Sequence, residues 1–361
     1  MPELICNLHI HSKYSDGSGD YTQILRSAAN CGLDVVIVTD HNILVKNVER
    51  YQFTGDRKTL LLTGEEVHNQ DRHPQKSHTL VIGCPHEMAD FGSDPQTLIN
   101  EVNAHKGMTF LAHPYEYDLP AVGEDDISWA DWDVRGFTGL ELWNGFSELK
   151  SVSRNLVSLL RHVLFPGLIP HGPLPQALAK WDELLTAGDK VVAVAGSDAH
   201  ALDYHAGPIR KTIFPYTYHF STINNHLLVN QELSGDIDAD SRMVYQALAS
   251  GASFIGFDQP ASTRGFSFTA ENDNEIVSLG ETLLLERGAT LRAQLPRQAN
   301  LRVIHNGRVT LNLPRADRLV QTITDPGYYR IEAYINYKNA RRGWIFSNPI
   351  YIDKKSKPGL I

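Results

Sequence analysis

The sequence predicts an α/β protein built of βαβ units, followed by a small antiparallel β-sandwich. Up to about residue 258, short apolar runs alternate with segments of helical period. Strands that alternate with helices in this way form parallel sheets. Beyond about residue 260, β-rich runs are separated by Gly, Pro, Asn and Asp, which is typical of a sandwich. We therefore expect two domains, residues 1–258 and residues 259–361.

The first domain contains seven strand-like runs, which lie at residues 4–8, 35–38, 60–62, 79–82, 109–112, 139–142 and 191–195. Helix-period segments occur between them, several opened by Ser, Asp or Pro, at residues 21–31, 95–105, 147–163 and 174–185. Two polar insertions, residues 115–137 and 165–173, interrupt this alternation. We expect both insertions to be loops that cover a substrate, because they are longer than plain connections need to be.

The second domain has β-rich runs at residues 265–269, 290–293, 300–303, 309–311, 328–334 and 344–352. It contains no cluster of His, Asp and Glu residues comparable to that of the first domain. We therefore expect it to brace the first domain, to border the site or to mediate self-association. The sequence does not predict the oligomeric state.

Composition favours a soluble protein that acts on small molecules. The formal net charge is -9 and no Lys/Arg-rich run is present, so we expect no extended nucleic-acid partner and no membrane partner. No apolar run approaches the roughly 20 residues that span a bilayer, and no leader precedes residue 9, so we expect a cytoplasmic protein. Cys6, Cys31 and Cys84 lack CxxC spacing, which favours packing over a zinc site or disulfides.

The first apolar run ends in a pair of histidines, His9 and His11. Alternation along a strand places both on one face, where two imidazoles can bind one metal ion. Asp16 follows after a turn and offers a carboxylate oxygen. Because such short motifs also occur as surface histidines, this pair alone is a weak prediction.

Four further apolar runs end in the same kinds of residue. They deliver His41, Glu65 and Glu66, His113, and the pair Asp198 and His200. In a parallel barrel the carboxyl ends of the strands share one face, and active sites are built there. Unrelated placement would scatter such residues over both ends, so five coincident strand ends predict a multinuclear metal site.

The set HxHxxxxDG, TDHN, GxE, AHP and GSDAH resembles the polymerase and histidinol phosphatase (PHP) family of metallo-phosphoesterases over roughly residues 4–258. The resemblance implies a distorted (βα)7 barrel and two or three divalent ions, Zn, Mn or Fe. The runs GEEVH, ELWNG and SNPIY are similar to a branch of the family that includes carbamate-insecticide hydrolases.

The resemblance also implies which residues hold each ion. The first ion would be bound by His9, His11, Glu66 and Asp198. The second would be bound by Glu66 and His113, and the third by Asp16, His41 and His200.

Two assignments remain open at this stage: which of Glu65 and Glu66 is the bridging ligand, and what Glu141 does. We favour Glu66 over Glu65 as the bridging ligand, because the family spacing is Gly, any residue, Glu, and because a strand points only one of two neighbours into the site. Glu141 stands where some family members have another histidine. It is predicted either as a ligand or as a residue that orients a ligand, and the number of ions depends on that choice.

We predict a metal-dependent phosphoesterase that hydrolyses a small phosphate ester or nucleotide with a hydroxide bridging two ions. Glu66, Asp198 and His200 are the predicted catalytic residues, and Asp40 is expected to fix the tautomer of a neighbouring histidine. The predicted substrate-binding residues are Lys13, His78, Asn144, His205 and Arg210. For the two cations, and for Lys211, a solvated surface position is the commoner role.

Two other functions stay open. The same hydroxide could attack carbonyl carbon, which would give a carbamate, carboxyl-ester or amide hydrolase. Inward-facing Trp129, Trp132 and Trp143 would favour an aryl ester or carbamate, although all three could instead be core residues. The third possibility is a non-catalytic metal-binding scaffold, which the nearly complete ligand set disfavours.

Overall fold

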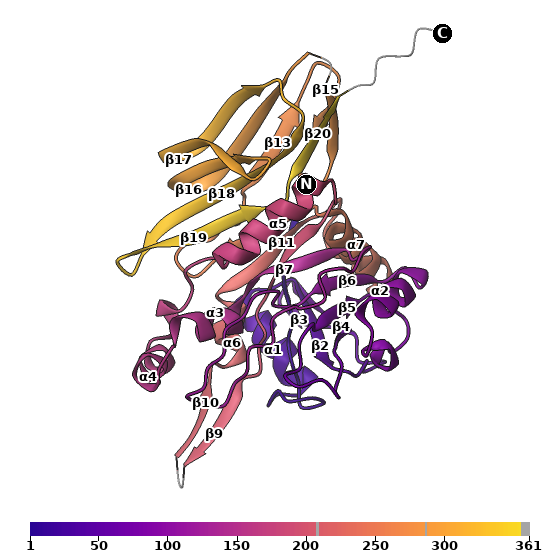
Figure 1. Cartoon of the computed structure of the whole chain (residues 1–361), viewed down its shortest axis with the longest axis vertical. Coiled ribbons are helices and arrows are strands. Elements are labelled where there is room, and N and C mark those ends of the chain that lie inside the picture. Colours follow the sequence, from indigo (N-terminus) through magenta and orange to yellow (C-terminus); the bar gives the residue numbers. More distant parts are fainter. Residues whose placement is uncertain (207–208, 286, 355–361) are drawn as a thin grey trace.

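The computed structural model describes residues 1–206, 209–285 and 287–354. Its first part is an α/β unit, and its last part is a β-rich unit that lies at the top of Figure 1. Strands β1–β8 and β11–β20 belong to one continuous sheet, while β9 (Leu202–Ala206) and β10 (Ile209–Ile213) form a separate hairpin. The predicted α/β fold class is confirmed.

Seven strands of the α/β unit lie side by side in the order β1-β2-β4-β5-β6-β7-β8. They are β1 (Glu3–Leu8), β2 (Val35–His41), β4 (Arg57–Val67), β5 (Thr79–Ile82), β6 (Met108–Leu111), β7 (Gly139–Asn144) and β8 (Val192–Gly196). Each overlaps one of the predicted runs. A parallel bridge between Ile10 and Ala199, just beyond β1 and β8, brings the two end strands together at their carboxyl ends.

Strand β5 departs from the predicted parallel pattern. It runs antiparallel to both of its neighbours, β4 and β6. The chain between β4 and β5 contains no helix, so it lacks the crossover that a parallel connection requires and returns beside the strand it has just left. β3 (Arg50–Thr54) is a further antiparallel strand that pairs with β4. Uniform βα alternation is therefore wrong for this part of the chain.

Helices cover the sheet at α1 (Tyr21–Cys31), α2 (Pro95–Ala104), α3 (Gly145–Val152), α4 (Leu156–Leu164), α5 (Pro175–Ala187), α6 (Tyr216–Phe220) and α7 (Ile237–Ser250). Short 3-10 turns occur at Ala89–Phe91 and Pro166–Leu168. The single helix predicted over residues 147–163 is two helices. It breaks because Asn155 accepts a hydrogen bond from the Ser158 backbone N–H and so starts a new helix.

The β-rich unit is formed by β13 (Ser267–Glu271), β14 (Ile276–Val277), β15 (Thr282–Leu285), β16 (Ala289–His305), β17 (Arg308–Ile323), β18 (Gly327–Tyr337), β19 (Ala340–Ser347) and β20 (Ile350–Lys354). Its long β16–β17 hairpin spans both halves of the unit, since β16 pairs with β13 at one end and with β18 at the other. The pairing is antiparallel except for β15 and β20, which are parallel.

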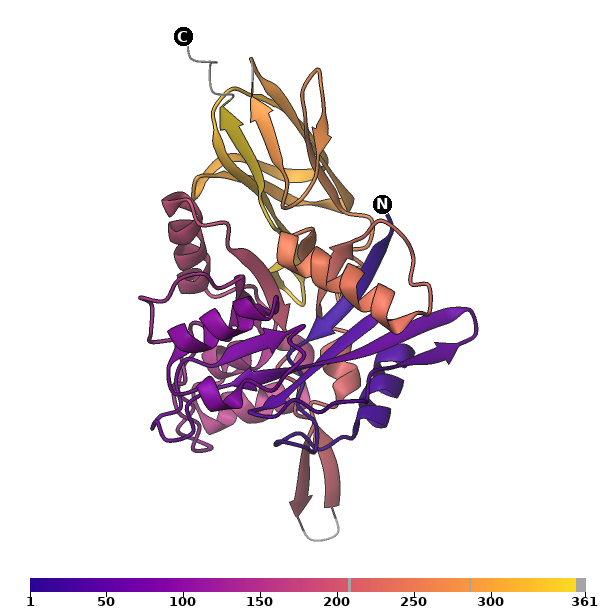
Figure 2. The ribbon, with the colours of Figure 1, turned by 90° about the vertical axis from the view of Figure 1, so that its right-hand side faces the viewer.

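The sheet continues across the predicted domain boundary. β11 (Ile223–Leu228) pairs with β1, β12 (Ser253–Phe257) pairs with β11, and β12 also pairs with β19 of the β-rich unit. The view in Figure 2 shows α7 in front of this junction. One apolar core crosses it and includes Trp143, Trp181 and Trp344. The division at residue 258 therefore stays a prediction.

None of the described helices is both long enough and apolar enough to cross a membrane. The three cysteines are free, and Cys6 is buried.

Candidate metal centre

The ends of several strands of the α/β unit meet around one buried carboxylate, Glu66 at the end of β4. Five histidines approach its two oxygens. His9, His11 and His41 lie 3.1, 3.2 and 3.1 Å from Oε2. His78 and His113 lie 2.8 and 3.0 Å from Oε1. These residues come from five separate segments of the chain, so the fold itself assembles the cluster.

A second carboxylate, Asp198, follows β8 and faces the same histidines. Its Oδ1 lies 3.5 Å from His9 Nε2 and 3.3 Å from His11 Nε2. Asp198 and Glu66 therefore flank the two histidines of the HxH motif from opposite sides. This is the arrangement that the resemblance implies for the first ion.

Asp16 lies at the outer edge of the cluster. Its Oδ2 is 3.2 Å from His200 Nε2 and 3.6 Å from His41 Nε2. The rings of His41 and His200 both stack against His11, with centroids 4.4 and 4.2 Å away. The Asp16 side chain is 54% exposed, so this edge of the cluster is open to a substrate.

The ligand atoms of the cluster form overlapping groups that are close enough to hold ions. They are His11–Asp16–His41–His200, His9–His113–Asp198, His9–His11–Glu66 and His41–Glu66–His78. Every predicted ligand except Glu141 belongs to at least one of these groups.

Several buried nitrogen and oxygen atoms of these residues have no hydrogen-bond partner. They are His9 Nε2, His11 Nδ1 and Nε2, His41 Nδ1, His78 Nε2, His113 Nδ1 and Glu66 Oε2. Leaving one buried polar atom unpaired costs about 1–3 kcal/mol, and native proteins seldom contain such a concentration. Imidazole nitrogens and carboxylate oxygens are the donors that Zn, Mn and Fe prefer, so divalent ions fit this site.

The histidines and carboxylates of the cluster shift one another's pKa values. Burial alone would raise the pKa of Glu66, but His9, His41 and His78 hold it well below its usual value. Burial would lower the pKa of His11, yet Asp198 and Glu66 raise it to about 9. Burial lowers the pKa of His41 to about 3. The carboxylates thus stay ionised, and His41 stays neutral and able to bind a metal.

Backbone conformation marks the same positions. His9, His113 and Asp198 have φ angles of 62°, 28° and 51°, in the left-handed region that non-glycine residues seldom occupy. Such strain is typical of functional sites, where the surrounding fold holds a side chain in place. Gly196 is needed beside them, because a side chain there would collide with the carboxylate of Glu141.

Glu65 and Glu66 point to opposite faces of β4. Glu65 accepts a hydrogen bond from the Met88 backbone N–H, 2.7 Å away, on the side of β4 that faces away from the cluster. Burial raises the pKa of Glu65 to about 7. The geometry therefore favours Glu66 as the bridging residue, as strand alternation predicts.

Glu141 contacts ligands and belongs to none of the candidate groups. Its Oε1 lies 2.8 Å from His9 Nδ1, and its Oε2 accepts the backbone N–H of His113 at 2.7 Å. This geometry favours the orienting role over direct binding. Asp40 does not contact a histidine ring but accepts hydrogen bonds from Ser12 and Tyr21, so it orders the turn after His11.

Asn144 and His78, both predicted to bind substrate, also contact residues of the cluster, and their substrate-binding roles stay predictions. The Asn144 amide nitrogen donates to Glu141 and Asp198, and its oxygen caps α3, so Asn144 positions Asp198. His78 lies against Glu66 inside the cluster. The prediction did not include His68, whose ring stacks on His78 with centroids 4.3 Å apart. The GEEVH motif contains His68, but nothing in the sequence marks its neighbour His78 as part of the cluster.

The cluster opens into a cavity of about 500 Å³. Its walls include residues 73–75, residues 123–125, Ile127, Phe146 and Leu202, together with His41, His78, His113 and His200. The predicted cover loop 115–137 thus does border the site, whereas the residues that line this cavity do not include any of the loop 165–173.

Two of the cations considered for phosphate binding, Lys13 and Lys211, do not line the cavity. Lys13 has a side chain that is 57% exposed and lies 4.0 Å from Asp20, outside the cavity walls. Lys211 is exposed on β10. The side chains of His205 and Arg210 lie outside the described residues.

None of the three tryptophans lines the cavity of about 500 Å³. Trp129 and Trp143 are buried in the main core, and Trp132 packs against Tyr115 at the edge of that core. An aryl pocket built from these tryptophans is therefore wrong.

Part of the chain is similar to known proteins. Residues 7–115 match the family model of the PHP domain. An uncharacterized protein of Methanocaldococcus jannaschii, MJ1587, is 27% identical over 152 residues, which are 39% of this chain and 81% of that protein.

Two solved structures match this chain at low sequence identity and low TM-score. One, from Bacteroides vulgatus, is a two-domain protein containing a predicted PHP-like metal-dependent phosphoesterase; it is 15% identical, covers 96% of this chain and 95% of its own, and has a TM-score of 0.42. The other, from Bifidobacterium adolescentis, is 14% identical, covers 58% of this chain and 92% of its own, and has a TM-score of 0.28.

Proposed function

Because residues 7–115 belong to the PHP domain family, we propose that this chain is a metal-dependent phosphoesterase that hydrolyses a small phosphate ester or nucleotide. The observation that carries the proposal is Glu66, a buried carboxylate that five histidines share while many of their nitrogens have no other partner. A purely structural cluster would be expected to satisfy those atoms within the protein.

We assign two or three ions, Zn, Mn or Fe, to this cluster. Glu66 belongs to two of the candidate groups and would be the bridging ligand. With it, His9, His11 and Asp198 would hold the first ion, and Asp16, His41 and His200, which lie together with His11, would hold the outermost one. His113 and His78 both reach Glu66 Oε1, so His78 supplies the second histidine that Glu141 does not.

When bound, the ions would supply Lewis acidity and an activated water for attack on phosphorus. The residues of this chain have distinct tasks in that reaction. Glu66 and Asp198, held ionised by their histidines, offset the positive charge of the ions and fix their spacing. Asn144 and Glu141 hold Asp198 and His9 in orientation. His200, beside exposed Asp16, is placed to contact the substrate or its leaving group.

The cavity limits the substrate to a small molecule, since about 500 Å³ is within the range of ordinary ligand sites. We further propose that residues 1–258 carry the reaction in the cytoplasm and that residues 259–361 brace them. Arg330 of β18 supports the second point. It is buried and makes two hydrogen bonds to Asp182 of α5, at 3.0 and 2.7 Å.

A carbamate, carboxyl-ester or amide hydrolase is the second candidate. The observation that favours it is the cavity wall, which includes Phe146, Ile127 and Leu202 but, among the described residues, no Lys or Arg. An uncharged substrate therefore meets no unpaired cation there, and a phosphate would depend on the ions alone for its charge.

The test is to purify the full chain with Mn, Zn or Fe, count bound metal by mass spectrometry, and assay three substrates in parallel. These are p-nitrophenyl phosphate, bis-p-nitrophenyl phosphate and 1-naphthyl N-methylcarbamate. Turnover of a phosphate ester that rises with bound metal supports the proposal. Turnover of the carbamate alone would overturn it in favour of the second candidate. Full metal loading without turnover of any substrate would favour a scaffold.

A further inference from the structure

Helix α4 exposes an apolar face that the rest of the chain does not cover. Five large apolar side chains in this one segment are more than half exposed: Leu156 (65%), Val157 (80%), Leu160 (59%), Leu164 (56%) and Phe165 (59%). Contiguous apolar patches of roughly 300–600 Å² are the largest on typical soluble proteins and often mark interaction sites. We define Leu156, Val157, Leu160, Leu164 and Phe165 as the α4 patch.

The opposite face of α4 is anchored. Leu159 and Val163 pack against a small apolar cluster that contains Leu149, Ile169 and Phe214. His162 is buried and bonds Ser153. The helix is therefore held in place by one side, and its outer side is presented to the surroundings.

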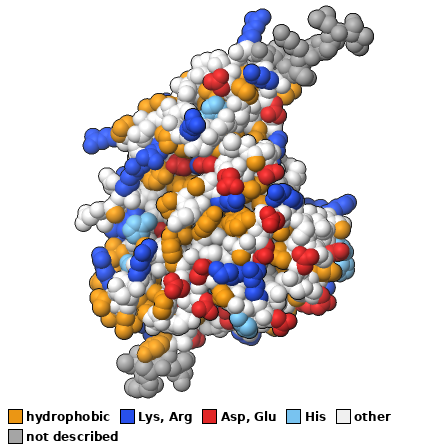
Figure 3. All heavy atoms as spheres, in the orientation of Figure 1, with side chains coloured by type: hydrophobic (Ala, Val, Ile, Leu, Met, Phe, Trp, Pro, Cys, Tyr) orange, Lys and Arg blue, Asp and Glu red, His pale blue; other side chains and the backbone are white. Residues whose placement is uncertain are grey.

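The charged residues in the segment that contains the α4 patch are basic. No Asp or Glu occurs between Glu148 and Asp182, in a chain that has 42 acidic residues. Arg154 and Arg161 are exposed at the patch, and no described carboxylate lies within 4.0 Å of either. Figure 3 shows basic and hydrophobic side chains together at the lower left, where Figure 1 places α4. The overall charge of -9 hides this local excess of cations.

These features distinguish between two occupants. A second copy of the chain, packed α4 against α4, would bring its arginines close to the same arginines with no acidic residue from that segment to pair with them. A surface that is both apolar and anionic would cover the exposed apolar side chains and also pair with the arginines. A short helix with bulky apolar side chains and flanking arginines is the kind of element that lies in a membrane interface.

We propose that the α4 patch, with Arg154 and Arg161, docks the protein on an anionic lipid surface. The β9–β10 hairpin projects from the same end of the molecule in Figure 1, and it exposes Leu202 (44%) and Tyr204 (54%). Leu202 also lines the cavity, as does Phe146 of α3, the helix that precedes α4. Docking through α4 therefore sets the mouth of the cavity near the lipid surface.

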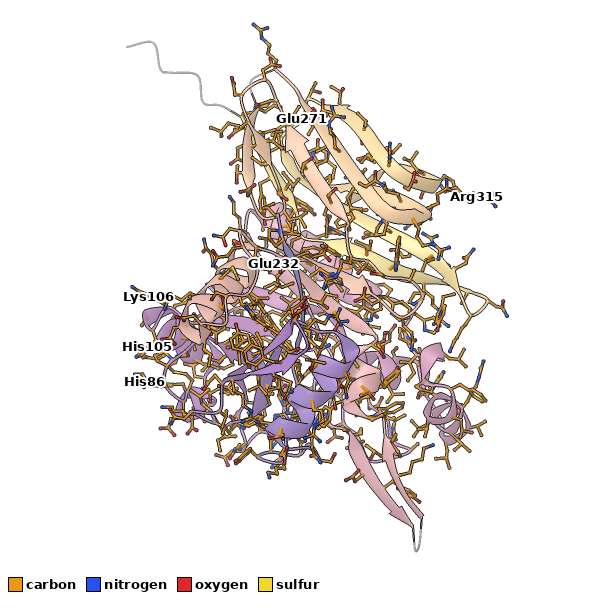
Figure 4. All side chains as sticks on the ribbon, turned by 180° about the vertical axis from the view of Figure 1, so that it is seen from behind. His86, His105, Lys106, Glu232, Glu271 and Arg315 are labelled. Atoms are coloured by element: carbon orange, nitrogen blue, oxygen red, sulfur yellow. The ribbon has the colours of Figure 1, made fainter. Side chains whose placement is uncertain are left out.

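The experiment is co-sedimentation of the full chain with vesicles of phosphatidylcholine alone and with 30% phosphatidylglycerol. We expect binding to the anionic vesicles, weakened by salt and by each arginine replaced, at about fivefold for Arg161→Gln. Val157→Asp should weaken it at least about tenfold. Matched controls are Val320→Asp and Arg315→Gln on β17, two exposed residues of the β-rich unit. Figure 4 shows Arg315 in that unit, away from the α/β unit.

Equal loss in the α4 and β17 variants, or no binding to anionic vesicles, would overturn the proposal. Light scattering provides the second measurement. A dimer that Val157→Asp dissociates would assign the patch to a second copy instead. Urea unfolding, unchanged in Val157→Asp, shows that the variant is folded and keeps this test separate from the proposed activity.

Discussion

Two buried clusters that combine histidine with carboxylates lie at opposite ends of strand β1. They differ in whether the histidine nitrogens have hydrogen-bond partners within the protein. At the amino end, His226 lies 2.6 Å from Glu3 and 3.1 Å from Asp258, and Thr263 also contacts its Nε2. Both ring nitrogens are satisfied. At the carboxyl end, the nitrogens around Glu66 outnumber the oxygens available to them, and many are unpaired.

The difference separates a structural ion pair from a ligand site. Both clusters are buried and both shift pKa values strongly, so neither burial nor titration distinguishes them. What distinguishes them is whether the protein completes its own hydrogen bonds. The His226 cluster is complete without a ligand, whereas the Glu66 cluster is complete only with ions in it.

The largest expected effect contrasts Glu66 with its neighbour Glu65. Glu66→Gln removes the carboxylate that five histidines share, so bound metal should fall and turnover should drop at least about 100-fold, more than the loss of an orienting group. Glu65→Gln makes the same chemical change on the other face of β4, and this variant should keep its bound metal and its turnover. Metal counts and rates at saturating metal measure this. Equal losses in the two variants would contradict the assignment.

The next prediction tests the His226 cluster, whose hydrogen bonds are complete without a ligand. His226→Asn leaves Glu3 and Asp258 without their shared partner, and breaking a buried pair costs about 3–5 kcal/mol. Urea unfolding measures this. His162→Asn is the control, because His162 makes one neutral hydrogen bond, worth about 1 kcal/mol. Metal content should stay normal in both variants, and a loss of metal in His226→Asn would show that the two clusters are coupled.

The third prediction is that His226 makes the free energy of unfolding depend on pH. Burial would lower the pKa of His226, but Asp258 and Glu3 raise it to about 9, above the unfolded value of about 6.5. The stabilisation is therefore fully present below pH 6.5 and is lost as the pH rises through 9, up to about 3 kcal/mol in all. The free-energy difference between wild type and His226→Asn should shrink over this range. A constant difference would argue against a charged His226.

The smallest expected effect concerns Glu141. Glu141→Gln keeps the shape but weakens the hold on His9 and on the His113 backbone, so metal affinity or turnover should fall roughly 10- to 100-fold. The number of bound ions at saturation should not change. Loss of one ion per chain would instead make Glu141 a direct ligand. Metal titration distinguishes the two results.

Local sequence patterns predicted the site where its residues follow strands. His9, His113 and Asp198 end apolar runs, and strands of one direction carry their ends to one face. Strand alternation also distinguished Glu66 from Glu65. These inferences need only period and order, which a sequence contains.

The features that the sequence did not predict depend on contacts between distant segments. His78 precedes its strand instead of following it, and it reaches the cluster only because β5 runs antiparallel. Trp143 is core and not cavity because β12 and β19 pack across it, which no local pattern indicates. The orienting role of Glu141 depends on Gly196, which lets the carboxylate approach.

The bridge between Ile10 and Ala199 has a consequence for synthesis of the chain. Ile10 leaves the ribosome well before its partner Ala199, which follows β8. His9 and His11 therefore emerge long before Asp198 and His200, and β8 is the last of the seven strands to be made. The full cluster can therefore assemble only after β8 has left the ribosome.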